Sequence, residues 1–300
     1  KGGEAILILG SEKTGIYDCG MACFNEKLIE NIRAVLEPAG RTLDYVFMSH
    51  THYDHIGALP YLIRQWPDVK VCGSPKAEKV FKSEGAKKTM VRLGENARQL
   101  YGCGDVEITA EGIIFEDQQF KVICRKLKHG IQSFGYRIEE ADHQGMLQAD
   151  KVKEAGIPFG PMYGKLKKGE TITLEDGRTF NGKEFIGETQ KGRIVTILGD
   201  TKKTKNNVLL AENASILVHE STFDGANRKM ARDYNHSTNL DAAEVAKEAL
   251  VAKLVLTHIS ARYLGRDIYL LEKEARKVFP NTQIANDFDE IDIPLIRTDK

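Results

Sequence analysis

Residues 49–60, SHTHYDHIGALP, bring several metal-binding side chains together in one short stretch. His50, His52, Asp54 and His55 fall within six positions, directly after an apolar run. Imidazole nitrogens and carboxylate oxygens are the ligands that suit Zn²⁺ at open, catalytic sites. In an extended loop, residues two apart point to the same side, so His50 and His52 can bind one ion together. Asp54 and His55 follow the turn and can bind a second ion.

The chain has eight histidines, and most of the others also follow apolar runs. Four of them lie in or just after predicted strands or in tight polar motifs: His129, His219, His236 and His258. We assign no role to His143, and we expect His219 to be a buried strand end. Asp200 ends another apolar run, so Asp200, His129 and His258 can complete the shells of two ions. Two divalent ions about 3.5–4 Å apart, bridged by hydroxide and carboxylate, hydrolyse phosphodiesters and acyl groups.

Short apolar strands alternate with helical segments along the chain. Strands are predicted within residues 5–10, 14–20, 43–50, 69–74, 120–129, 134–140, 193–200, 215–220 and 253–258. Helices are predicted within residues 24–40, from near residue 57, within 77–86 and within 240–250. Continuous apolar strands separated by helices indicate an α/β fold whose sheets are covered by helices. Such folds place ligands at the carboxyl ends of their strands, where these polar residues lie.

Composition and charge exclude some classes of function. The chain has 300 residues, 41% of them hydrophobic, and a formal net charge of zero, so a nucleic-acid role would require a local basic patch. Its five cysteines match no zinc-ribbon spacing and predict reduced thiols in a cytoplasmic protein. We find no signal peptide and no apolar run of the roughly 20 residues that span a bilayer, so we expect no membrane association.

Residues 140–187 interrupt the alternation of strands and helices. The segment is rich in Gly, Pro and Lys and has few long apolar runs. A structureless stretch of this length is uncommon unless it is functional. We therefore expect a single domain over residues 1–300 with an inserted arm at 140–187 that projects from it and forms no second core.

The HxHxDH motif, followed by a distant His, Asp and His, resembles the metallo-β-lactamase superfamily. That resemblance implies an αββα sandwich with a dinuclear site at its edge. From about residue 111 onward the chain resembles ribonuclease Z, the tRNA 3′-processing endonuclease. The matching stretches include GIPFGPMYGKLKKGETITLEDGR, ILGDT, LVHESTF, HST and LTHISARY. The first third differs, with Tyr53 where that family typically has Gly, and is closer to generic hydrolases of the same fold.

The resemblance implies a role for each polar residue. It places His50, His52 and His129 on one zinc ion. It places Asp54, His55 and His258 on the other, with Asp200 bridging the two. Two Zn²⁺ per chain are expected, with Mn²⁺ as the alternative metal and no organic cofactor. His236 corresponds to a catalytic histidine that Glu220 orients, and Asp54 can also hold the proton of the nucleophile.

The same resemblance implies precursor tRNA as substrate, cut to leave a 3′-hydroxyl, and a homodimer. The arm would hold the tRNA, with its tip near Gly160 and Pro161. Three lysines on the arm would contact phosphates: Lys165, Lys167 and Lys168. Arg262 could clamp a substrate phosphate or form a structural salt bridge, and the sequence favours neither.

Other functions stay open at this point. The Tyr-Asp-His-Ile-Gly sequence and the first third favour a hydrolase of a small thioester or lactone as the alternative. A non-enzymatic protein that keeps the fold is disfavoured by the intact set of ligands. A flavodiiron-type oxidoreductase would favour a carboxylate where His52 stands and would need a flavin domain.

Overall fold

The computed structural model describes residues 4–10, 12–73, 107–108 and 111–295. The chain forms two compact units. The larger unit comprises Lys1–Glu116, Lys121–Ile138 and Ile194–Glu290, and the smaller comprises Asp117–Phe120, Glu139–Arg193 and Ile291–Lys300.

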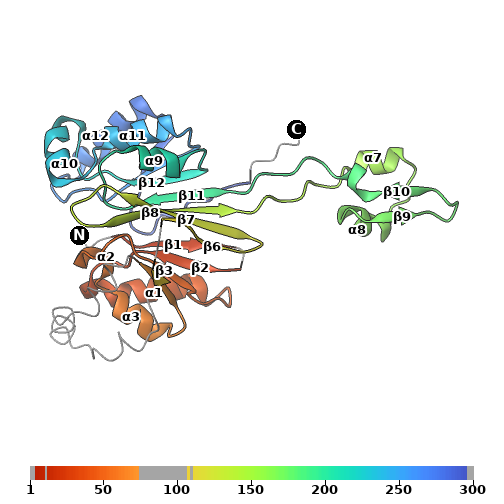
Figure 1. Cartoon of the computed structure of the whole chain (residues 1–300), viewed down its shortest axis with the longest axis horizontal. Helices are drawn as coiled ribbons and strands as arrows, with labels where there is room; N and C mark the ends of the chain where they lie inside the picture. Colours follow the sequence, from red (N-terminus) through yellow and green to blue (C-terminus); the bar gives the residue numbers. More distant parts are fainter. Residues whose placement is uncertain (1–3, 11, 74–106, 109–110, 296–300) are drawn as a thin grey trace. The chain divides into compact units, whose positions relative to one another are not determined.

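The first sheet of the larger unit has five strands in sequence order (Figure 1). They are β1 (Ile6–Leu9), β2 (Thr14–Tyr17), β3 (Tyr45–Phe47), β4 (Lys70–Gly73) and β5 (Glu107–Ile108). β1 pairs antiparallel with β2, and the remaining pairs are parallel. The helices after β2 and β3 include η1 (Ala22–Phe24), α1 (Asn25–Leu36), α2 (Tyr53–Ile56) and α3 (Leu59–Gln65). α1 buries Ile32 and Leu36 against this sheet, as its helical spacing of apolar residues predicts.

The second sheet has seven strands in the order β14-β13-β12-β11-β8-β7-β6. These are β6 (Gly112–Glu116), β7 (Phe120–Leu127), β8 (Ser133–Glu140), β11 (Ile194–Leu198), β12 (Ile216–Glu220), β13 (Leu254–Thr257) and β14 (Thr282–Ile284). The four strands from β11 to β14 pair in parallel with one another. The helices of this half are α9 (Lys205–Ala211), η3 (Gly225–Asn227), α10 (Arg228–Tyr234), α11 (Asn239–Glu248) and α12 (Arg266–Val278).

The two sheets face each other, and helices cover their outer faces (Figure 1). Aromatic rings fill the space between the sheets: Tyr136 lies edge-on to Tyr17 at 5.9 Å and 5.4 Å from Phe47, centroid to centroid. The Tyr136 hydroxyl donates to the Met48 carbonyl at 2.9 Å, so its polar end is satisfied inside the core. The outer cores are mostly aliphatic, with alanines of α11 packed on the second sheet. The expected αββα sandwich is confirmed.

The smaller unit has its own hydrophobic core. It contains α7 (Ala149–Glu154), α8 (Met162–Lys167), the hairpin of β9 (Thr171–Thr173) and β10 (Thr179–Asn181), and η2 (Gly182–Phe185). Six of its apolar residues are buried together: Val152, Ile157, Leu166, Ile172, Leu174 and Phe185. The expectation that residues 140–187 form no second core is therefore wrong. The apolar residues are single and widely spaced, so no long run marked them in the sequence.

The strands and helices expected from the sequence occur where the chain is described, most of them within the predicted ranges, while β8 and α11 each begin one residue earlier than predicted. The helix expected from near residue 57 is divided into α2 and α3. The helix expected at 77–86 lies outside the described residues. Among those described, no helix combines the length and the apolar character needed to cross a membrane.

Candidate metal centre

The metal-binding candidates lie at the carboxyl ends of strands from both sheets. In the first sheet, Asp18 follows β2 and the stretch from His50 follows β3. In the second, His129 follows β7, Asp200 follows β11 and His258 follows β13. Parallel strands present their carboxyl ends at one edge, so the two sheets together assemble a single site.

Gly199 allows the two sheets to approach closely beside this site. A Cβ atom built on Gly199 would lie 2.6 Å from the Tyr17 hydroxyl and 2.7 Å from the Ser49 Cβ. Only glycine fits this contact without displacing the first sheet. The next residue, Asp200, is thereby placed against the histidines that follow β3.

All seven residues predicted as metal ligands lie together. Their ligand atoms fall into overlapping groups, each within 4.8 Å. One group contains His50, His52, His129 and Asp200, another contains Asp54, His55 and His258, and a third contains Asp200, His236 and His258. Asp200 is central: its Oδ2 lies 3.7 Å from His50 Nε2 and 3.8 Å from both His55 Nε2 and His129 Nε2. Its Oδ1 lies 3.5 Å from His258 Nε2.

Hydrogen bonds on the far side of each ring fix which nitrogen faces the centre. His129 Nδ1 donates to the Asn235 carbonyl at 2.9 Å. His55 Nδ1 donates to Asp18 Oδ2 at 2.8 Å. In both rings Nε2 is therefore the atom directed at Asp200, and it is the atom that can bind a cation once it carries no proton.

Asp18 supports histidines of both metal groups. The fully buried carboxylate accepts the Ser49 amide at 2.8 Å on Oδ1 and the Ser49 hydroxyl at 2.5 Å on Oδ2. The Ser49 hydroxyl in turn accepts from His50 Nδ1 at 2.8 Å. Asp18 therefore orients His55 directly and His50 through Ser49. Its backbone φ of +52° lies in the left-handed region, which Asp adopts more readily than most residues.

The donor set fits a divalent cation. His55 Nε2 is buried and has no hydrogen-bond partner among the described residues, and His50 Nε2 lies only 3.0 Å from His52 Nδ1. Burial and the neighbouring histidines hold the pKa of His50 well below its usual range, so this imidazole is neutral. Burial opposes protonation of His55 as well, but the Asp18 carboxylate outweighs it and raises the pKa of His55 to about 10, so a cation that binds at Nε2 must displace a proton from that atom. A more basic imidazole is a stronger metal ligand.

His236 and Glu220 form a buried pair beside the metal groups. Glu220 Oε1 accepts a hydrogen bond from His236 Nδ1 at 2.9 Å and another from the Thr201 amide at 2.7 Å. Burial would raise the pKa of Glu220, but the hydrogen bond from His236 lowers it to about 2. Burial lowers the pKa of His236, but Glu220 more than compensates and raises it. Glu220 thus favours the protonated form of His236, whose Nδ1 lies 4.0 Å from Asp200 Oδ2.

The residues predicted to bind substrate lie outside the metal groups, in the larger and the smaller unit. The Arg262 guanidinium stacks on the Phe223 ring at 4.8 Å, and no carboxylate of the described chain forms an ion pair with it. Gly160 and Pro161 precede α8 in the smaller unit. Three exposed lysines lie in and directly after that helix: Lys165, Lys167 and Lys168. Tyr53 begins α2, and its side chain lies outside the described part of the molecule. His219 is fully buried, as expected.

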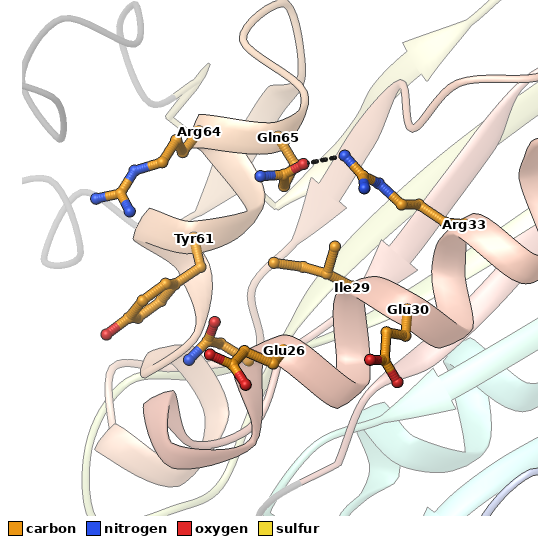
Figure 2. Close-up of a pocket in the computed structure, with 8 residues that line it drawn as sticks. Glu26, Ile29, Glu30, Arg33, Tyr61, Arg64 and Gln65 are labelled. Carbon is orange, nitrogen blue, oxygen red and sulfur yellow. Dashed lines mark hydrogen bonds between the residues drawn. The ribbon is translucent and has the colours of Figure 1, made fainter.

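The sequence reasoning missed several supporting residues: Asp18, Ser49, Thr222 and Asn235. Asp18 follows an apolar strand as the predicted ligands do, and that position is the signal that could have identified it. Asn235 acts through its main-chain carbonyl, which any residue could supply. A separate hollow of about 310 Å³ between α1 and α3 has no metal-binding cluster among the described residues, and there Arg33 donates to the Gln65 side chain (Figure 2).

Comparisons with known proteins agree with this architecture. A sequence profile described as the Metallo-beta-lactamase superfamily matches residues 2–133, which include the HxHxDH motif. Ribonuclease Z of Enterococcus faecalis is 48% identical over 283 residues, covering 93% of this chain and 87% of that protein. Ribonuclease Z of Ligilactobacillus salivarius is 46% identical over 290 residues, covering 94% and 88%. The chain therefore belongs to the ribonuclease Z family, and the likeness extends well into its first third.

Solved structures share the fold. Human short-form tRNase Z superposes with a TM-score of 0.58 at 21% identity, covering 98% of this chain and 93% of that one. The metallo-β-lactamase-fold protein YhfI of Bacillus subtilis superposes with a TM-score of 0.60 at 19% identity, covering 94% and 88%.

Proposed function

We propose that this protein is a metal-dependent endoribonuclease that removes the 3′ trailer from precursor tRNA and leaves a 3′-hydroxyl. The observation that carries the proposal is the cluster of seven metal-binding side chains with the His236–Glu220 pair beside it. It occurs in a chain 48% identical to a ribonuclease Z. A small-molecule hydrolase would need the cluster but would have no use for an exposed basic surface on the smaller unit.

The site would hold two Zn²⁺ ions, with Mn²⁺ as a substitute. His50, His52 and His129 would bind one, Asp54, His55 and His258 the other, and Asp200 both. Bound divalent cations supply the Lewis acidity that activates water and neutralises phosphate charge. Asp54, whose side chain is 46% exposed, can hold the proton released by the nucleophile. His236, whose pKa is raised by its hydrogen bond to Glu220, would donate a proton to the leaving oxygen.

The smaller unit would bind the body of the tRNA. The net charge of the whole chain is zero, but five lysines and a single glutamate lie between residues 151 and 168. Phe159, in the same stretch, is 91% exposed, and its ring packs against Tyr163 at 5.1 Å. Lysines beside exposed aromatic rings suit an RNA backbone and its bases. We therefore infer that the arm, residues 140–187, is the tRNA-binding element.

Arg262 would clamp a phosphate near the metal centre. Its guanidinium carbon lies 4.8 Å from the centre of the Phe223 ring, and it has no competing carboxylate within the described chain, which leaves its charge available. We also propose a cytoplasmic homodimer, as the family resemblance implies. Light scattering on the purified protein would test the oligomeric state.

A cleavage assay tests the function. The metal-stripped protein, reloaded with Zn²⁺ or Mn²⁺, is incubated with a precursor tRNA carrying a 3′ trailer, and product ends are tested for ligation through a 3′-hydroxyl. Bis(p-nitrophenyl) phosphate serves as a small substrate that needs only the metal centre. A variant with Ala in place of three arm lysines, Lys165, Lys167 and Lys168, should cleave tRNA more slowly. Its hydrolysis of the small substrate should be unchanged.

A matched triple variant controls for charge alone. It replaces three exposed lysines of the larger unit: Lys205, Lys273 and Lys277. This variant should cleave both substrates like the unmodified protein. A metal-loaded protein that releases no trailer but turns over a thioester or lactone would refute the proposed function in favour of the small-molecule alternative.

A further inference from the structure

We propose that Thr222 is a positioning residue that connects the acid–base pair to the metal centre. Its hydroxyl links the Glu220 carboxylate to the ring of His258, so a single carboxylate orients both His236 and a metal ligand. The inference rests on the proposed metal site, but its test reads metal binding and ring protonation, not RNA cleavage.

The strand register brings Thr222 to His258. β12 and β13 pair in parallel with Glu220 opposite Thr257, and the Ser221 amide extends the ladder by donating to the Thr257 carbonyl at 2.8 Å. The chains leaving the two strands therefore run side by side. Thr222 Oγ consequently lies 2.9 Å from His258 Nδ1.

The single proton of the Thr222 hydroxyl decides which group donates in each of its hydrogen bonds. A threonine hydroxyl has one proton to donate and two lone pairs. Thr222 Oγ lies 2.6 Å from Glu220 Oε2, and an ionised carboxylate can only accept, so the proton points to Glu220. The hydroxyl must then accept from His258 Nδ1–H. This assigns the His258 proton to Nδ1 and leaves Nε2 free toward Asp200.

The two carboxylate oxygens of Glu220 accept hydrogen bonds from different partners. Oε1 accepts hydrogen bonds from His236 Nδ1 and from the Thr201 amide. Oε2 accepts hydrogen bonds from the Thr222 hydroxyl and, at 3.1 Å, from the Ser237 amide. His236 Nδ1 is also 3.3 Å from Thr222 Oγ, but its shorter contact at 2.9 Å is to Glu220. Removing the hydroxyl would therefore disturb His258 and leave the His236–Glu220 bond in place.

His258 has particular need of such a partner. Its φ is +51°, a backbone conformation that residues other than glycine rarely adopt, and its side chain is 19% exposed. The neighbouring imidazoles of His55 and His236 stack near it with centroids 5.4 Å and 5.6 Å away. Stacking leaves a ring free to turn over and exchange its two nitrogens, whereas a hydrogen bond to Nδ1 fixes the orientation.

The test replaces the hydroxyl and keeps the shape. Zn²⁺ affinity is measured by competition with a chromophoric chelator for the unmodified protein and for Thr222→Val, Thr222→Ser and Thr196→Val. We expect Thr222→Val to bind one of its two ions about 10–100-fold more weakly, because loss of an outer hydrogen-bond partner has effects of this size. Thr222→Ser, which keeps the hydroxyl, should stay within about threefold of the unmodified protein. Thr196→Val is the matched control, a buried threonine that donates to the Leu210 carbonyl at 3.0 Å.

A second measurement uses the unmodified protein, so it does not depend on any variant folding. Nitrogen chemical shifts of the His258 ring report which nitrogen carries the proton, and we expect Nδ1. A folded Thr222→Val protein that binds both ions normally would overturn the proposal, as would a His258 protonated at Nε2. If the protein cut no precursor tRNA but showed the expected affinities and shifts, the proposed function would fail and this inference would stand.

Discussion

Substituting Asp18 with Asn should weaken both proposed metal sites while leaving the fold intact. The side chain is fully buried, so the nearly isosteric Asn creates no cavity. Asn also tolerates the left-handed φ of +52° at this position. The change therefore acts on hydrogen bonds and charge.

The hydrogen bonds determine how the new amide must sit. The Ser49 amide donates to Oδ1 at 2.8 Å, so the amide oxygen of Asn must occupy that position. The NH₂ group then replaces Oδ2, which accepted from His55 Nδ1 at 2.8 Å and from the Ser49 hydroxyl at 2.5 Å. Facing a donor, His55 Nδ1 must give up its proton, which moves to Nε2 and blocks the atom directed at Asp200. Once the Ser49 hydroxyl accepts from the new amide, its own proton can turn to His50 Nδ1, with the same result there.

Each proposed ion thus loses one correctly protonated ligand. An outer-partner loss typically costs 10–100-fold in metal affinity, so we expect that decrease at each ion, or about 1.4–2.7 kcal/mol per ion. Chelator competition measures both affinities, and circular dichroism checks that the protein is folded. Asp44→Asn is the control, since Asp44 accepts the Thr14 amide at 2.8 Å and Lys13 at 2.9 Å away from the cluster. A folded Asp18→Asn protein with unchanged affinity for both ions would refute the tautomer argument.

Three further substitutions test separate parts of the structure. The hydrogen bond from Arg193 lowers the pKa of Glu140 from its usual 4.5 to about 2. This pair therefore stabilises the fold above pH 4.5, and its contribution is lost as the pH falls toward 2. Glu140→Gln should remove this pH-dependent contribution to the free energy of unfolding, which urea unfolding at several pH values measures. Leu166→Ala, at a fully buried position, should destabilise the smaller unit by about 2–5 kcal/mol, measured by hydrogen exchange of its amides. Gly199→Ala would place a methyl group 2.6 Å from the Tyr17 hydroxyl and should destabilise the larger unit by about 1–3 kcal/mol in urea unfolding.

The sequence predicted which side chains lie together at the candidate metal centre, because their signal is local. His50, His52, Asp54 and His55 lie in six consecutive positions, and the other candidates end apolar strands. Strand ends meet at one edge of a parallel sheet, so residue type and position were sufficient without knowledge of strand order. The layered α/β fold followed from the same alternation of strands and helices.

The supporting contacts depend on distances that no local pattern encodes. Asp18 and His55 are 37 positions apart, and His129 and Asn235 are 106 apart. The register of β12 against β13 brings Thr222 to His258, and a shift of one residue would turn the hydroxyl away. The core of the smaller unit was missed for a related reason, since residues such as Val152 and Leu166 lie singly among polar neighbours.

The candidate metal centre draws side chains from both sheets, which would couple cation binding to the packing of the sandwich. His50, His52, Asp54 and His55 follow β3 of the first sheet, whereas His129, Asp200 and His258 follow strands of the second. Neither sheet supplies a complete shell, so an ion that needs both binds the packed state in preference to the separated one. A ligand of this kind at 100 times its Kd stabilises the state it binds by about 2.7 kcal/mol. Asp200 is the pivotal residue in this coupling, because its carboxylate lies within 3.8 Å of ring nitrogens that follow strands of both sheets. The close approach at Gly199 would therefore serve binding as well as packing, since it sets the distance that a bound cation would span between the two sheets.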